Sequence, residues 1–269
     1  MKKRMVPIVM AVVMALSLTA CGKEKTVSLS EVSETSVSSV EDKEEAVEKE
    51  APAKEEVVTE ASVETVAETS VEASETEEDE VVFLGRVEDG AYINDFYGIK
   101  ITPAEGVIFA DDNMLGLLNN IALENLSNSD SKLSKLTSEM LKNGQNVIDA
   151  YAYEGMGLNS LNVTVAYIGE GVGQDFAYAL AEMTASSAQQ IFGAQGMDVQ
   201  SSEASTMEIS GKEIPCVKTV AKVETNGATV DTYILQGIII KDGYGATLTA
   251  GSYLEDNTDK QFEMVTLFE

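Results

Sequence analysis

From Val81 onward the chain carries two hydrophobic patterns, one with period two and one with the spacing of an amphipathic helix. Between Leu161 and Tyr167 every second side chain is apolar, which is typical of a half-buried strand. From Val172 to Phe192 apolar residues recur at helical spacing, which predicts a long helix that ends before Gly193. Its predicted inward residues are Phe176, Leu180, Met183, Ala188 and Ile191.

Further strands are predicted where short apolar or alternating runs are bounded by Gly, Pro, Asn or Asp. They are Val81–Leu84, Tyr92–Tyr97, Ile99–Thr102, Val147–Tyr153, Leu161–Ile168, Val199–Ile209, Ile214–Glu224, Ala228–Ile240 and Ala246–Leu254. Asn226-Gly227 is a strong hairpin signal. The Ile238–Ile240 run predicts a central strand buried on both faces.

Three shorter helices are predicted because residues that favour helix starts precede apolar faces. The expected caps are Asp111 or Asp112, then Ser129 or Asp130, and finally Asn257 or Thr258 before a helix that runs to Leu267. Strands are followed by helices, a hairpin, the long helix and a run of strands. This order predicts one α+β domain over 81–269, an antiparallel β-sheet covered by helices.

The segment Tyr92–Pro103 (YINDFYGIKITP), followed by Asn143-Gly144-Gln145 and Tyr151-Ala152-Tyr153, resembles a group of small acidic-stalked lipoproteins of Firmicutes. The domain of these proteins is similar to the PsbP-like fold. The resemblance covers most of 90–269 and rests on structural motifs. It implies a PsbP-like domain with a binding or accessory role, and it assigns no reaction and no functional residue.

Residues 1–20 have the features of a secretory signal peptide. Residues 2–4 are basic, and the uncharged run Met5–Leu18 is shorter than the roughly 20 residues of a transmembrane helix. The sequence Leu18-Thr19-Ala20-Cys21 resembles a bacterial lipobox. The resemblance implies a diacylglyceryl group on Cys21, which would hold the protein on the extracytoplasmic face of the cell membrane. The alternative is an ordinary cleaved signal with an incidental Cys.

Residues 21–80, which follow the signal, are predicted to form a disordered acidic tether. Residues 22–80 hold 20 acidic and 5 basic side chains and no aromatic residue. Such a segment buries too little apolar surface to offset the entropy lost on ordering. We therefore expect a stalk between the lipid anchor and the domain, and the alternative is a solubilising tail with no required length.

Charge and composition exclude several functional classes. The 269 residues include 46 acidic and 18 basic side chains, no His and two Cys. An acidic surface disfavours nucleic acid. Without His, the familiar Ser-His-Asp and Cys-His catalytic sets and His-based metal sites are excluded. We therefore expect no cofactor, no metal site and no enzymatic activity.

Three tyrosines are the candidate binding residues. Tyr151, Tyr153 and Tyr167 lie on the two strands of one predicted hairpin, and we expect them to share one sheet face that could line a sugar or peptide groove. Cys216 is expected to be buried on a strand rather than to act as a nucleophile. The acidic run 255–259 is expected to be a helix-entry loop, with a calcium site as the alternative.

The sequence therefore predicts a lipid-anchored binding or accessory module of the cell envelope. Its expected partners are the membrane, through Cys21, and an envelope protein or the cell wall. The alternatives are a carboxylate-based hydrolase acting on envelope or extracellular glycans, and a purely structural envelope protein.

Overall fold

The computed structural model describes residues 83–122, 126, 132–155, 157–225 and 227–269. The predicted signal peptide, Cys21 and the predicted tether lie outside the described residues. The helix cap expected at Ser129 or Asp130 also lies outside them.

Strands hold more of the described residues than helices do. They are β1 (Arg86–Glu88), β2 (Ala91–Asn94), β3 (Ile99–Ile101), β4 (Val107–Phe109), β5 (Val147–Glu154), β6 (Asn159–Tyr167), β7 (Met197–Ile209), β8 (Lys212–Thr225), β9 (Ala228–Lys241), β10 (Tyr244–Tyr253) and β11 (Val265–Leu267). The helices are α1 (Asp112–Leu118), α3 (Lys132–Lys142), α4 (Asp175–Gly193) and α5 (Thr258–Phe262). In the part of the chain that is described, no helix is long and apolar enough to cross a membrane.

The strands form two antiparallel sheets. The larger sheet has seven strands in the order β4-β5-β6-β10-β9-β8-β7, and the smaller has four in the order β1-β2-β3-β11. Long hairpins build the larger sheet because successive strands alternate apolar and polar side chains around short turns. The α+β class predicted from the sequence is confirmed, although the sequence did not predict that the short strands form a sheet of their own.

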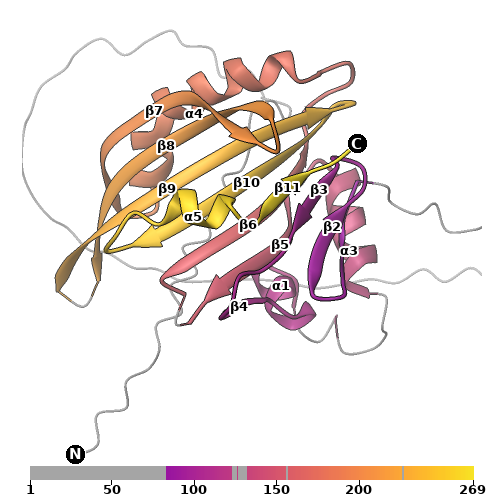
Figure 1. The fold of residues 1–269 in the computed structure, drawn as a ribbon, viewed down its shortest axis with the longest axis horizontal. Coiled ribbons are helices and arrows are strands. Elements are labelled where there is room, and N and C mark those ends of the chain that lie inside the picture. The colour runs from indigo at the N-terminus through magenta and orange to yellow at the C-terminus, as the bar shows by residue number, and fades with distance from the viewer. Residues whose placement is uncertain (1–82, 123–125, 127–131, 156, 226) are drawn as a thin grey trace, which may run out of the picture. The chain divides into compact units, whose positions relative to one another are not determined.

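The two faces of the seven-stranded sheet carry different side chains. We call one the core face; it carries Leu161, Val163 and Leu248, and the four-stranded sheet and α5 pack on it (Figure 1). We call the opposite face the helix face; it carries Thr164 and Thr247. Helix α4 packs there over β7, β8 and β9, while α1 packs near the other edge, on β5.

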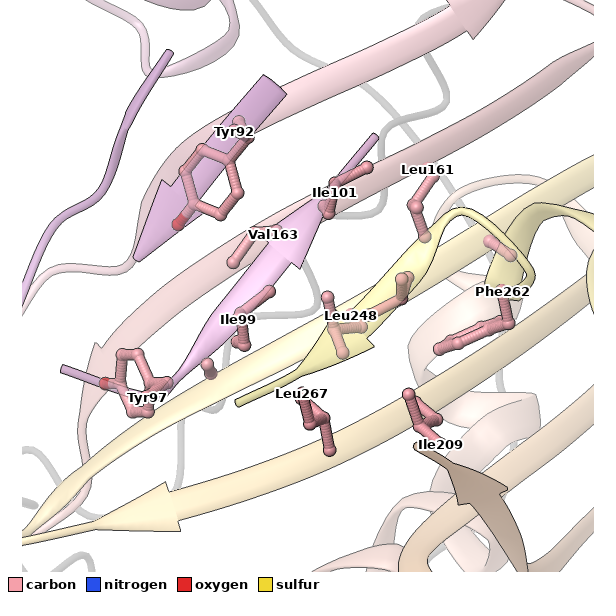
Figure 2. Close-up of a cluster of buried hydrophobic side chains, with 14 of the residues drawn as sticks. Tyr92, Tyr97, Ile99, Ile101, Leu161, Val163, Ile209, Leu248, Phe262 and Leu267 are labelled. Atoms are coloured by element: carbon pink, nitrogen blue, oxygen red, sulfur yellow. The ribbon is translucent and has the colours of Figure 1, made fainter. Parts of the chain in front are cut away.

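The main hydrophobic core lies between the two sheets. Ile99 and Ile101 of β3 are fully buried there, opposite Val163 and Leu248 of the larger sheet, and Phe262 of α5 closes one side (Figure 2). Each such side chain contributes about 1.5–3 kcal/mol when it is removed from water. Packing between the sheets is therefore what holds β2, β3 and β11, which are too short to be stable alone.

The predicted last helix ends early. Helix α5 stops at Phe262, and Val265–Leu267 forms β11, which pairs with β3 through Val265↔Ile101 and Leu267↔Ile99. The prediction that the helix runs to Leu267 is therefore wrong. Val265 and Leu267 flank Thr266 with period two, and burial between the sheets selects the strand over the helix.

The inward face of α4 also differs from the prediction. Phe176 and Met183 are 38% and 53% exposed, whereas small residues form most of the buried face. The buried residues are Ala177, Leu180, Ala181, Ala188 and Phe192. Because alanine side chains are small, they allow the helix axis to lie close to the sheet. The face that carries them therefore packs on the sheet, and the larger Phe176 and Met183 side chains face solvent.

Two side-chain amides replace missing strand partners at the margins of the larger sheet. Asn119 donates from Nδ2 to the Ile148 carbonyl at 2.9 Å and accepts from the Ile148 N–H at 2.8 Å. Gln174 accepts from the Ile240 N–H at 2.7 Å and donates to the Ile238 carbonyl at 3.3 Å. Both amides satisfy backbone groups that no neighbouring strand reaches.

Candidate functional site

One concave site lies on the core face, where α5 meets the tip of the β5–β6 hairpin. This pocket, which we call the α5 pocket, has a volume of about 510 Å³. Its walls come from the segment around β4, from the hairpin tip, and from α5 with its flanking residues. They are Ala104, Glu105, Val107, Ala152, Tyr153, Glu154, Asn159, Ser160, Leu161, Glu255, Asn257, Lys260, Gln261, Glu263 and Met264.

Local hydrogen bonds fix the start of α5 beside the pocket. Asn257 holds the N-cap position, one of the two that we expected, but its side chain makes no capping hydrogen bond. Asp256 instead accepts from the Thr258 N–H at 3.2 Å and from the Thr258 hydroxyl at 2.7 Å. Lys218 of β8 lies 2.9 Å from the Asp256 carboxylate. Burial acts to raise the pKa of Asp256, but the Thr258 and Lys218 hydrogen bonds outweigh it and lower that pKa.

The charge of the α5 pocket is predominantly negative. Glu105, Glu154, Glu255 and Glu263 line it, and Lys260 is the one basic residue among its lining residues. The Glu154 carboxylate accepts a hydrogen bond from Asn159 Nδ2 at 2.9 Å, which orients it at the hairpin tip. The four carboxylates are spread over the three walls of the pocket, where they attract cations and accept hydrogen bonds from amines and hydroxyls.

Gln261 is the most buried polar residue in the pocket lining. Its side chain is buried, with 6% exposure, and its Nε2 donates to the Gly251 carbonyl at 3.0 Å. Its Oε1 has no hydrogen-bond partner among the residues that the structure describes. A buried amide oxygen without a partner costs about 1–3 kcal/mol, so it is a ready acceptor for a ligand or a water molecule.

The three predicted tyrosines do not share one surface, so that prediction is wrong. Tyr151 is 6% exposed and packs near α1 on the helix face, and Tyr153 stacks on it with ring centroids 5.7 Å apart. Tyr153 lines the α5 pocket, but its ring lies on the face opposite α5. Tyr167 pairs with Tyr244 at the far end of β6, on the core face with Val165. Residues an even number apart share a face along a regular strand, and the register of β5 against β6 places 151 beside 162, not beside 161.

Tyr167 instead belongs to a cluster of aromatic rings near the first described residues. Its ring centroid lies 5.1 Å from that of Tyr244, which stacks on Phe83 at 3.9 Å. Phe96 meets Phe83 edge-on at 4.9 Å, and the Lys241 ammonium lies 4.9 Å from the centre of the Phe96 ring. These contacts attach the beginning of the domain to β10, and only Tyr167 among them is an exposed large hydrophobic residue.

The sequence pattern did not single out a half-buried carboxylate beside this cluster. Asp149 sits at a bulge in β5, and its Oδ2 accepts from the Tyr92 hydroxyl at 2.5 Å and from the Gly85 N–H at 2.7 Å. Burial raises the pKa of Asp149, while these hydrogen bonds oppose the rise. The sequence does hold a signal, because an acidic residue between Ile148 and Ala150 interrupts an apolar strand.

The remaining candidate residues have structural roles. Cys216 is buried and free, and burial raises the pKa of its thiol, which opposes nucleophilic chemistry. Within the described ranges, no three acidic or Cys side chains come close enough to hold a metal ion. In the run 255–259, Asp256 and Asp259 lie beside Lys218, which supports the helix-entry interpretation of this segment.

No family model matches the chain, and no curated protein matches it. Among solved structures it is similar to the solution structure of cyanobacterial PsbP (CyanoP) from Synechocystis sp. PCC 6803, with 14% identity and a TM-score of 0.38, over 66% of this chain and 91% of that chain. It is also similar to LpqN, described as involved in cell envelope biogenesis of Mycobacterium tuberculosis, with 11% identity and a TM-score of 0.27, over 41% of this chain and 64% of LpqN. At these values neither likeness assigns a ligand or a functional residue.

Proposed function

We propose that the protein is a lipid-anchored, extracytoplasmic binding or accessory module of the cell envelope that has no catalytic activity and binds its ligand in the α5 pocket. The anchor and the stalk are supported by the lipobox at Cys21 and by the composition of residues 21–80. The observation that carries the ligand site is a pocket of about 510 Å³ with several carboxylates in its lining.

The ligand class follows from the pocket lining. Four glutamates and one lysine favour a cationic group, and the side-chain amides of Asn159, Asn257 and Gln261 favour hydroxyl or amide groups beside it. Apolar residues such as Val107, Leu161 and Met264 supply a dry surface for the body of the ligand. A small amino sugar or an amine-bearing peptide has this combination of groups.

The hydrolase alternative concerns the same pocket. A glycosidase needs two carboxyl groups that act as acid and as base or nucleophile, and the α5 pocket contains four carboxylates. Hydrolysis of a bound glycan would therefore replace the binding proposal with the enzymatic one. Absence of any ligand would favour the purely structural alternative.

Calorimetric titration of residues 21–269 carrying Cys21→Ser with glucosamine trimer tests the site. We expect saturable binding, and we expect Glu255→Gln and Glu263→Gln each to weaken it about tenfold, because each removes a charge-assisted hydrogen bond of roughly 1.5–3 kcal/mol. Glu182→Gln on α4, which packs on the opposite face of the sheet, is the matched control and should leave the affinity unchanged. The N-acetylated trimer, which lacks the amines, should bind more weakly.

Two results would count against the proposal. Equal binding of the free and N-acetylated trimers would remove the role of charge, and cleavage of either trimer, detected by mass spectrometry, would make the protein an enzyme. The anchor has its own test. Cells that express the full chain should incorporate labelled fatty acid into the wild type and not into Cys21→Ser, and continued labelling of the variant would refute lipidation.

A further inference from the structure

A second cavity lies beside the edge of β5 to which Asn119 is hydrogen-bonded. Its volume is about 580 Å³, and we call it the amide pocket. It is built from the end of α1 and the four residues after it, from one side of α3, from the link between α3 and β5, and from one residue each of β5 and β6. The lining residues are Leu118, Asn119, Asn120, Ile121, Ala122, Leu136, Glu139, Met140, Asn143, Gln145, Asn146, Ile148 and Thr164.

The amide pocket differs from the α5 pocket in its chemistry. Glu139 is its one charged lining residue, in a domain whose residues 81–269 contain 26 acidic side chains. Side-chain amides and aliphatic groups make up most of the rest, with no aromatic ring. This lining disfavours an ionic ligand and fits a neutral one with hydrogen-bonding groups and aliphatic branches.

One wall of this pocket shows how its amides can hold a peptide. Asn119 pairs with both the N–H and the carbonyl of Ile148, at 2.8 and 2.9 Å, as a strand residue would. Gln174 forms the same kind of pair with Ile238 and Ile240 of β9. A carboxamide that donates and accepts at once matches the N–H and carbonyl of an extended chain.

Three further amides of the pocket are free to form such pairs. The side chains of Asn143, Gln145 and Asn146 make no hydrogen bond within the described part of the chain. Beside Thr164 on the helix face, the Thr247 hydroxyl is buried and has no partner among the described residues. Asn143 and Gln145 are exposed and Asn146 is half-buried, so these amides lie at the rim of the pocket, where the backbone of a bound chain can reach them.

We propose that the amide pocket binds an extended, uncharged peptide segment with aliphatic side chains. The free amides would pair with its backbone in the manner of Asn119, and Leu118, Leu136 and Met140 would contact its side chains. This inference goes beyond the proposed function and does not depend on it, because the two pockets share no lining residue.

The probe is the blocked tripeptide acetyl-Leu-Ala-Leu-amide, added to ¹⁵N-labelled residues 21–269 carrying Cys21→Ser. We expect saturable shifts of the side-chain amide signals of Asn143, Gln145 and Asn146 in the ¹H–¹⁵N spectrum. Asn146→Leu should raise Kd by at least about fivefold, because loss of a paired amide removes two neutral hydrogen bonds. Gln200→Leu, a similar change on the exposed strand β7, should leave Kd unchanged.

Acetyl-Glu-Ala-Glu-amide and the neutral sugar maltotriose complete the comparison. Both should bind at least about tenfold more weakly than the Leu peptide. The proposal is overturned if the Leu peptide shifts none of the three amides at 10 mM, if Asn146→Leu and Gln200→Leu bind it equally, or if maltotriose binds as tightly. Unchanged dispersion of the variant spectra verifies folding, and Asn143→Leu provides a second variant if Asn146→Leu does not fold.

Discussion

Asp149 provides the sharpest test of how the beginning of the domain is attached to the larger sheet. Its Oδ2 is the oxygen that accepts from the Tyr92 hydroxyl, from the Gly85 N–H and, at 3.4 Å, from Asn94. The carboxylate thereby joins β5 to β2 and to the segment before β1. Two substitutions separate the two properties of this group: Asp149→Ala removes the acceptor and the charge, and Asp149→Asn removes only the charge.

The magnitudes follow from the hydrogen bonds and from the direction of the pKa shift. Two hydrogen bonds to a charged acceptor contribute roughly 3–6 kcal/mol, and relief of the buried charge returns part of this, so Asp149→Ala should lower the free energy of unfolding by about 3 kcal/mol. Burial raises the pKa of Asp149, which means that the fold disfavours the charge relative to water. Asp149→Asn, whose oxygen can occupy the Oδ2 position, should therefore stay within about 1 kcal/mol of the wild type.

Urea unfolding of residues 21–269 carrying Cys21→Ser, followed by far-ultraviolet circular dichroism because the chain has no Trp, measures these differences. The pKa of Asp149 is higher in the folded than in the unfolded state, so the native state binds more protons between the two values. The stability of the wild type relative to Asp149→Asn should thus fall as pH rises through that acidic window. A loss in Asp149→Asn as large as that in Asp149→Ala, or a relative stability that rises with pH, would refute the reasoning.

Three further predictions concern other parts of the fold. Gly98→Ala should lower the free energy of unfolding by at least about 2 kcal/mol more than Gly90→Ala in the same urea assay. Both glycines have positive φ, but a Cβ added at 98 would meet a backbone oxygen at 2.2 Å, whereas a Cβ added at 90 would meet nothing within 4 Å. Equal losses of stability in the two variants would contradict the close approach at Gly98. Lys218→Met should raise the pKa of Asp256, as measured by carboxyl ¹³C titration, because the ion pair is removed. It should also lower the free energy of unfolding by under about 1 kcal/mol. This difference from the wild type should disappear as pH falls through the pKa of Asp256, because the protonated carboxyl no longer attracts Lys218. In the Cys21→Ser background, Cys216 should react slowly with an aromatic disulfide reagent until the chain unfolds, and fast labelling of the folded protein would show that the thiol is not buried.

Local signals in the sequence predicted local structure well. Asp111 caps α1 by accepting from the Met114 N–H at 2.9 Å, and Gly144 follows α3 with positive φ, as expected. The hairpin from β8 to β9 closes at Thr225↔Ala228, around Asn226-Gly227. Such features depend on backbone preferences of a few neighbouring residues, which a sequence contains directly.

Features that depend on distant partners could not be predicted in the same way. Val265–Leu267 becomes a strand because β3, more than 160 residues earlier, offers it an edge. Each pocket is lined by segments that are distant in the sequence and that only the tertiary fold brings together. The charge of a pocket lining could therefore not be predicted from any one segment of the sequence. Of the three predicted tyrosines, Tyr153 lines the α5 pocket, and it does so with its ring stacked on Tyr151 on the opposite face.

The pairing of β11 with β3 also sets the timing of folding during synthesis. Ile99 and Ile101 are fully buried in a sheet whose last strand is Val265–Leu267 (Figure 2). The core between the two sheets can therefore close only after residue 267 has left the ribosome. If the chain crosses a membrane as the proposed anchor requires, the core between the sheets can close on the far side only once residue 267 has also crossed.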